Sequence, residues 1–388
     1  MMENEHLSEV QGYASYADYL ANNYANATAY YAACHASEPN YLAILTAATG
    51  ESATNQNCRD GTVTHGENYT QYPSQNGTGS CSTGLCLNSI IEELNNHTLT
   101  AVTYAENLHT NASGNGGILA TSDSAKYQCN QALNTTKGPK SEESDMYAYN
   151  HVSVLQLGYV VNQPHACWDG TPGVNGGLAF LNDAANFSAA INSTAFPNFA
   201  FFVPNLWDDG LEKVGTYTGA ECGNSTIGTC TAYANTWLRN FLTPKLNDTS
   251  NGVYTSTGDY NLQHTAFVVV WDESDPQYTT GYAAGFNATT TAINQETPSH
   301  QYCIHAYHQY GGLYGSSNLD TVCGGAVYMS VSGPYSHGLG KFTAYQSDYS
   351  ITAAIETLFG LPYLNNPGTS DVVFQNDLSM FGVTSNGY

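Results

Sequence analysis

The stretch TAFVVVWDESD, residues 265–275, is the part of the sequence that most strongly indicates the fold. An apolar, mostly β-branched run ends abruptly in carboxylates, which is typical of a buried parallel strand whose carboxyl end meets a loop. In open α/β sheets, ligands bind outside the carboxyl ends of the strands. The stretch therefore predicts a parallel sheet with Asp272 and Glu273 at its ligand-binding edge.

Other segments add strands and helices in alternation. FAFFVPN and AVYMSVSG are short apolar runs closed by proline or by Gly-Pro, as strands often are. The spacing of DYSITAAIETLFGLP places its apolar residues on one helical face, and glycine and proline end the helix. This alternation favours an α/β layered fold over a sandwich or a barrel. The expected strands are residues 199–205 and 326–333, and the expected helices are residues 87–95, 178–191, 233–242 and 348–359.

The chain of 388 residues is long enough to bury a sizeable core, and we expect a single domain over residues 1–388. Residues 50–84 and 107–176 are rich in Gly, Ser, Asn and Thr. We expect these segments to be loop-rich insertions into that domain rather than linkers between two domains, because cysteines lie among them.

The charge balance excludes two classes of partner. The chain carries 8 Lys+Arg against 32 Asp+Glu, a formal net charge of −24, and only 10% of its residues are charged. A surface without a basic patch cannot neutralise phosphates and repels anionic membranes. We therefore expect no nucleic-acid partner. No apolar run reaches the roughly 18 residues needed to span a bilayer, so no membrane span is expected.

Two features predict an extracellular or cell-surface protein. The 10 cysteines contain no C-x-x-C pair, which favours disulfides in an oxidising compartment over zinc or redox chemistry, with the pairing left open. Asn-x-Ser/Thr sequons offer sites for N-linked glycans. The sequence opens on MMENEHLSEV without a signal peptide, so we expect a mature or truncated form of a secreted chain. The sequons lie at Asn26, Asn68, Asn76, Asn96, Asn111, Asn134, Asn186, Asn192, Asn224, Asn247 and Asn287.

The stretch CHASEPNYLAILTAATG, residues 34–50, has two interpretations. In the first, Ser37 is an N-cap, Pro39 fits the first turn of a helix, and Gly50 stands where the helix stops. In the second, Ser37 is a nucleophile at a helix N-terminus, where a nearby metal ion would help to stabilise its alkoxide.

Oxygen ligands for a metal ion occur in three separate parts of the chain. Glu3 and Asn4 lie at its start, and Ser37 caps the helix expected within residues 34–50. Asp272 and Glu273 end the most apolar strand. Such hard oxygen ligands suit one divalent cation, with Mg, Ca or Mn as the natural choices and Zn as the less natural one.

Six stretches of the chain together resemble a known family. They are MMENEHLSEV, HASEPNYLAILTAATG, SIIEELNNHTLTAVTYAEN, FPNFAFFVPNLWDDG, FVVVWDESD and DYSITAAIETLFGLPYL. They occur in the order in which similar stretches occur in the phosphoesterase family, which includes acid phosphatases and phospholipase C-like enzymes. That family belongs to the alkaline phosphatase-like superfamily, and the resemblance covers nearly the whole chain.

The resemblance implies a three-layer α/β/α sandwich with a mostly parallel central sheet and long disulfide-bonded loops. It also implies hydrolysis of phosphate esters through a phosphoseryl intermediate on Ser37. Glu3 and Asn4 match one pair of the family's metal ligands, and Asp272 and Glu273 match the other pair. The Ser37 oxygen is then shared with the cation.

The histidines depart from the family pattern. Family members carry histidines in three segments where this chain has other residues, Asp348 among them, and a lost imidazole removes a phosphate donor or a general acid worth roughly 10²- to 10⁴-fold. His35 and His151 stand near matching positions. Together with Asn205 they are expected on the substrate side of the site.

Two functions from different classes follow. The first is a secreted, glycosylated, metal-dependent phosphoesterase of acid-phosphatase type that acts on a small phosphate ester. The alternative is a catalytically degenerate phosphoesterase fold that serves as an extracellular structural subunit and self-associates into oligomers or filaments. The missing histidines, the dense sequons and the 30 tyrosines favour the alternative.

Overall fold

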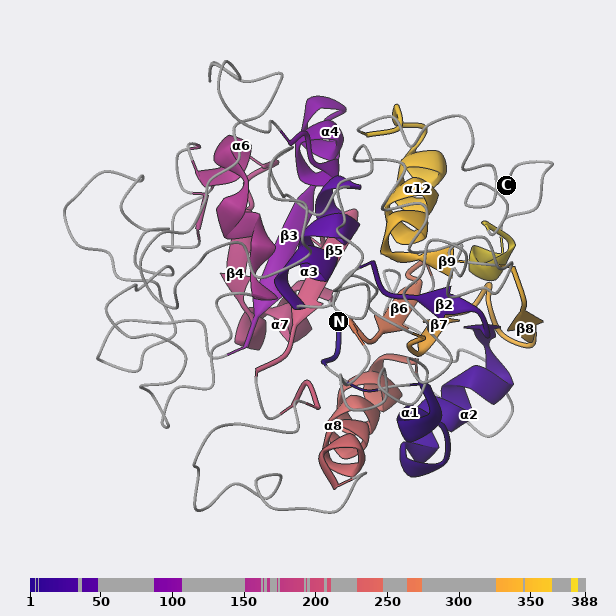
Figure 1. Cartoon of the computed structure of the whole chain (residues 1–388). Coiled ribbons are helices and arrows are strands. Elements are labelled where there is room, and N and C mark those ends of the chain that lie inside the picture. Colours follow the sequence, from indigo (N-terminus) through magenta and orange to yellow (C-terminus); the bar gives the residue numbers. More distant parts are fainter. Residues whose placement is uncertain are drawn as a thin grey trace, which may run out of the picture.

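The chain has an α/β fold with parallel-rich sheets, as the computed structural model shows (Figure 1). The class expected from the sequence is therefore confirmed. The structure describes residues 1–3, 5, 7–33, 37–47, 87–106, 151–161, 163, 166–167, 173, 175–191, 193, 196–205, 208–210, 229–246, 264–273, 326–344, 346–364 and 378–382.

A parallel sheet of three strands forms one part of the core. β3 (Ala101–Ala105) lies in the middle, between β4 (Leu181–Asp183) and β5 (Phe199–Val203). β3 is buried along its whole length and pairs with β5 residue for residue. The strand predicted at 199–205 is thus confirmed. Because the three strands are parallel, their carboxyl ends lie at one edge of the sheet.

A second sheet has the strand order β6 (Phe267–Val270), β7 (Met329–Ser332), β1 (Ala25–Ala27) and β8 (Lys341–Phe342). β7 runs antiparallel to both of its neighbours, whereas β1 and β8 are parallel. The prediction of a purely parallel strand in residues 265–275 is therefore wrong with respect to β7. A continuous apolar run indicates a strand that is buried on both faces of its sheet, but it does not determine the direction of the neighbouring strand.

Residues 1–3 lie between the two sheets and connect them. Met2 forms a parallel bridge with Trp271, and the Asp272 N–H donates to the Met2 carbonyl at 2.9 Å. On the opposite side, the Glu3 N–H donates to the Asp209 carbonyl at 2.8 Å. The carboxyl ends of β5, of this segment and of β6 are therefore neighbours, and the start of the chain lies near the middle of the molecule (Figure 1).

Helices cover both faces of the three-stranded sheet. On one face, α3 (Ser37–Thr46) packs its Tyr41 ring edge-on against Phe201, and α4 (Ile90–Asn96) contacts β3. On the other face, α7 (Phe187–Ile191) and α8 (Thr229–Leu246) pack aromatic side chains against alternate residues of β3 and β5. The alternation of side chains along a strand explains this division, because successive residues point to opposite faces.

α12 (Asp348–Phe359) packs against α3 and completes the layer of helices on that face. It ends at Gly360, which has a left-handed φ of 65° that a residue with a Cβ rarely adopts. The sequence predicted this helix and its end correctly. α4 and α8 likewise confirm the helices expected at 87–95 and 233–242, and β7 confirms the strand expected within 326–333.

The helix expected over residues 178–191 is wrong in its first half. Leu181–Asp183 form β4, η3 (Ala184–Asn186) is a 3₁₀ turn, and only the last five residues form α7. β4 pairs with β3 in parallel, so a tertiary partner overrides the local helical pattern.

The structure describes the loop-rich segments and the cysteines only in part. Most of residues 50–84 and 107–176 lies outside the described residues, although η2 (Ser153–Gln156) and α6 (Gly158–Val161) belong to the second of these segments. Eight of the 10 cysteines also lie outside them, so the disulfide framework stays a prediction. Within the described residues, no helix is both long and apolar enough to cross a bilayer.

The remaining elements are short. They are α1 (Leu7–Tyr13), α2 (Ser15–Asn23), β2 (Tyr30–Tyr31), η2 (Ser153–Gln156), α6 (Gly158–Val161) and β9 (Gln346–Ser347).

Candidate metal centre

Four carboxylates meet where neighbouring strands end. Glu3 is the last residue of the connecting segment, Asp209 follows β5, and Asp272 with Glu273 follows β6; none of the four residues is more than 4% exposed. One oxygen each from Glu3, Asp272 and Glu273 lies within 4.8 Å of the other two. The sequence prediction placed these three residues at one site, and the structure brings them together.

Ser37 is the first residue of α3, and its hydroxyl points into this cluster. Its Oγ hydrogen-bonds to Glu3 Oε1 and lies 3.0 Å from Glu273 Oε1. The serine hydroxyl has one proton, so it can donate a hydrogen bond to only one of the two carboxylates at a time. The oxygen of the other carboxylate then lies next to Oγ without that bond. The N-terminus of α3 adds a favourable field for negative charge on the serine oxygen.

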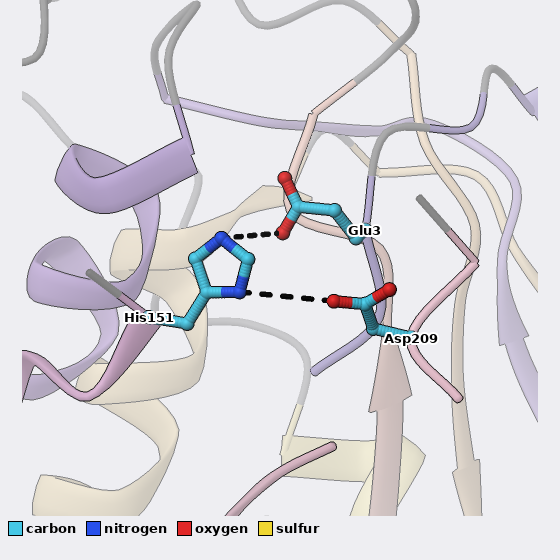
Figure 2. Close-up of side chains that lie close together, drawn as sticks. All are labelled: Glu3, His151 and Asp209. Carbon is cyan, nitrogen blue, oxygen red and sulfur yellow. Dashed lines mark ion pairs between the residues drawn. The ribbon is translucent and has the colours of Figure 1, made fainter. Parts of the chain in front are cut away.

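His151 joins the cluster from the other side of Glu3 (Figure 2). Its Nε2 lies 3.0 Å from Glu3 Oε2, and its Nδ1 lies 3.8 Å from Asp209 Oδ2. Tyr41, one helical turn after Ser37, stacks on the imidazole with ring centroids 4.6 Å apart and donates its hydroxyl to Glu3 Oε2 at 3.1 Å. Glu3 is thus held by groups from three different segments.

Burial determines the protonation of these groups. It raises the pKa of Glu3 well above the ordinary value, and the nearby carboxylates of Asp272 and Asp209 raise it further. Burial also lowers the pKa of His151 to about 3, so its imidazole is neutral near pH 7. The pKa of Tyr41 is raised well above its usual range for the same reason, and its hydroxyl remains a donor.

The residues present fit a divalent cation. Several buried carboxylates at such short distances repel one another, and burying a charge is costly unless it is paired or binds a metal. A neutral imidazole and carboxylate oxygens are suitable ligands for Mg, Mn, Ca or Zn. Glu3 belongs both to the group with Asp272 and Glu273 and to a second group with His151 and Asp209.

Asn205 lies outside this cluster, in a neighbouring network of its own. Its N–H donates to Glu106 Oε2 at 3.1 Å, and its Nδ2 donates to Asp208 Oδ2 at 2.9 Å. Burial, and after it the nearby Asp208, raises the pKa of Glu106 to about 8. Asn4 and His35, also predicted from the sequence, lie outside the described residues.

Sequence reasoning missed Asp209 and Tyr41 as members of this site. Asp209 follows Asp208 in the stretch WDDG, and only the turn after β5 decides which of the two carboxylates faces His151. The signal for Tyr41 was its spacing of four residues from Ser37, which places both residues on one face of a helix.

The metal-free chain is expected to be more stable near pH 5 than near pH 8. Burial raises the pKa of Asp348 and of Glu356 to about 8, and it raises that of Glu3 as well. The folded chain therefore keeps protons that the unfolded chain releases above about pH 4, and stability falls as the pH rises towards 8. His151 acts in the opposite direction below about pH 6.5, and so does the buried Met1 amino group, whose pKa is lowered to about 5, but these are two groups against the larger set of buried carboxyl groups with raised pKa values.

Urea unfolding in a chelator at the two pH values measures this difference, which we expect to be on the order of a few kcal/mol. Glu356→Gln should make the dependence shallower, because the amide cannot ionise. Equal stability at the two pH values would contradict the assigned protonation.

Solved structures of other proteins provide a comparison for the fold. A protein in the alkaline phosphatase superfamily from Vibrio parahaemolyticus is 10% identical, with a TM-score of 0.45, over 97% of this chain and 68% of that one. The lipoteichoic acid synthase LtaP from Listeria monocytogenes is also 10% identical, with a TM-score of 0.44, over 96% and 72% of the two chains. No family model matches the sequence, and no curated protein does.

Proposed function

We propose that the chain is a metal-dependent phosphoesterase of acid-phosphatase type with Ser37 as its nucleophile. The observation that supports this most directly is the contact of the Ser37 hydroxyl with Glu3 and Glu273, beside Asp272, His151 and Asp209. A serine on a helix N-terminus among buried carboxylates is an uncommon arrangement for a structural hydroxyl. It is suited to a nucleophile that must lose its proton.

The chemistry needs two displacements at phosphorus. In the first, Ser37 Oγ attacks the phosphorus and loses its proton, for which a neighbouring carboxylate is within hydrogen-bonding distance. The bond from phosphorus to the leaving oxygen breaks, and the alcohol departs with that electron pair and a proton. In the second, water attacks the phosphoserine, inorganic phosphate leaves, and Ser37 recovers its proton.

One divalent cation would be held by Glu3, Asp272 and Glu273 together with the Ser37 oxygen. When bound, it supplies positive charge that lowers the pKa of the serine and neutralises a phosphoryl oxygen. His151 and Asp209 hold Glu3 from the far side, and groups that orient a ligand in this way commonly contribute 10- to 100-fold to metal affinity. The chain's few Lys and Arg residues make such an ion the natural source of positive charge.

We place the protein outside the cell or on its surface, with N-linked glycans at exposed sequons. Among the described sequons, Asn96 is exposed and Asn186 is half-buried. Asn26 is only 2% exposed within β1, so a glycan at this position does not fit the folded chain. Asn26 is therefore removed from the set of surface sites.

The test is hydrolysis of a generic aryl phosphate between pH 3 and 8, with Mg, Mn, Ca or Zn supplied one at a time. We expect a maximum on the acidic side, because protonation below about pH 5 reduces the repulsion between a −24 chain and an anionic substrate. Activity no higher than that of Ser37→Ala would overturn the proposal. If that inactive protein also forms filaments in negative-stain images, the structural alternative is the better account.

A further inference from the structure

Asp348 is a buried carboxyl group that the chemistry above does not use. It is the first residue of α12 and has no exposed surface. Its Oδ1 accepts from the Tyr30 hydroxyl at 2.8 Å, and its Oδ2 accepts from the Ala33 N–H at 2.9 Å. Each carboxyl oxygen is therefore bound to a donor in the segment that leads into α3.

That segment is attached to α12 over several residues. β2 and β9 pair in parallel, with Tyr30 opposite Gln346 and Tyr31 opposite Ser347, so the two chains run side by side up to Asp348. Ala33 comes four residues before Ser37 in the sequence. The contact with Asp348 is thus the last described one on the path of the chain towards the nucleophile.

α12 also holds α3 at the opposite end. The Thr352 hydroxyl lies 3.1 Å from the Ala43 carbonyl and 2.7 Å from the Ile44 carbonyl, near the C-terminus of α3. One helix therefore bonds to the chain before α3 and to the last turn of α3. Of the two contacts, the one at Asp348 lies on the Ser37 side of α3, and the one at Thr352 lies at the other end of that helix.

We propose that Asp348 is a positioning residue that places Ser37 against Glu3 and Glu273 by holding the chain at Tyr30 and Ala33. This inference rests on the proposed function for its effect on rate. Its geometric part, the restraint on the segment before α3, stands independently. Positioning matters because a displacement of about 1 Å at a reacting atom can cost roughly 10²-fold in rate.

The site requires one acceptor for the Ala33 N–H and, in a fixed fork with it, a second polar atom that hydrogen-bonds to the Tyr30 hydroxyl. A carboxyl or carboxamide group supplies both, whereas a serine hydroxyl is too short to reach both partners. Burial raises the pKa of Asp348 to about 8, so the group is largely neutral at lower pH. In that state one oxygen still accepts from Ala33 while its O–H can donate to the Tyr30 oxygen, which an asparagine amide reproduces.

The test compares Asp348→Ala, Asp348→Asn and Thr352→Val. For Asp348→Ala we expect kcat to fall roughly 10²-fold with KM nearly unchanged, because substrate binding is kept while Ser37 is displaced. Asp348→Asn should restore most of the rate. Thr352→Val is the matched control: it removes a bond between the same two helices at the end far from Ser37, and its kcat should stay close to that of the wild type.

Hydrogen exchange of peptides covering residues 30–33 measures the restraint on the segment before α3, and it does not require catalytic activity. Asp348→Ala should accelerate exchange at Ala33 by about 5- to 10-fold, as expected for the loss of one hydrogen bond, while Asp348→Asn leaves it nearly unchanged. Unchanged exchange at Ala33, or a wild-type kcat in folded Asp348→Ala, would overturn the inference. If the wild type is no more active than Ser37→Ala, the proposed function fails, and the exchange result still decides whether Asp348 holds this segment.

Should Asp348→Ala not fold, Asp348→Ser replaces it in both measurements. Its short hydroxyl keeps a polar group at the start of α12 but cannot accept from both donors. The expected changes are the same in direction, and wild-type exchange together with a wild-type kcat would again contradict the inference.

Discussion

Ser37→Ala is expected to reduce phosphate-ester hydrolysis by roughly 10⁴- to 10⁶-fold, the range seen when a covalent nucleophile is removed. The physical reason is that the hydroxyl oxygen in contact with Glu3 and Glu273 is the atom that would bond to phosphorus. The loss should appear in kcat, because the buried carboxylates around the site remain in place.

Acid-quenched reactions with ³²P-labelled substrate provide a second readout. The wild type should carry label on the peptide that contains Ser37, and Ser37→Ala should carry none. Ser193→Ala is a suitable control, since the hydroxyl of this half-buried serine donates to the Ala190 carbonyl at 2.8 Å, in a different part of the fold. Label on another residue, or substantial activity in Ser37→Ala, would assign the chemistry elsewhere.

Asp272→Asn is expected to have two effects of opposite sign. It should weaken divalent-cation binding by at least about 100-fold, since a charged ligand contributes more than the outer groups worth 10- to 100-fold. It should also stabilise the metal-free chain near pH 8, because it removes one of several buried like charges while keeping an oxygen for the Glu273 N–H.

Titration with Mn²⁺ in a calorimeter and thermal unfolding with and without the ion measure the two effects. At a free ion concentration 100 times Kd, the wild type should gain about 2.7 kcal/mol of stability. Glu356→Gln is the matched control for the Mn²⁺ titration and should leave the ion affinity unchanged, because Glu356 is equally buried but bonds to Leu364 instead. A destabilised metal-free Asp272→Asn with unchanged ion affinity would show that Asp272 has a structural role only.

The local sequence pattern was sufficient to predict those helices and strands whose buried face is set by the spacing of their own apolar residues. The apolar face of α12 and its glycine stop were readable from the sequence, as was the strand β5. The pattern failed at Leu181–Asp183, where pairing with β3 makes a strand of residues that resemble the start of a helix. It also failed to show that β7 runs antiparallel to β6, since an apolar run has no direction.

For the candidate site, too, the sequence predicted some features and the tertiary structure determined the others. Ser37, Glu3, Asp272 and Glu273 stood out because each occupies a recognisable local context: a helix start, the chain start or a strand end. Their proximity could not be derived from those contexts, because it depends on residues 1–3 lying between two sheets. Asp209 could not be told from Asp208, because the conformation of the turn after β5 decides which carboxylate faces His151.

By itself, the sequence determined the α/β class, the negative charge and most of the candidate oxygen ligands, because these depend on composition and on short-range spacing. Only the tertiary structure decided that four carboxylates, an imidazole and one serine hydroxyl share a buried volume. The physical reason is that strand ends distant in the chain meet only after their backbones pair. The same pairing places Asp348 where it can hold the segment before Ser37.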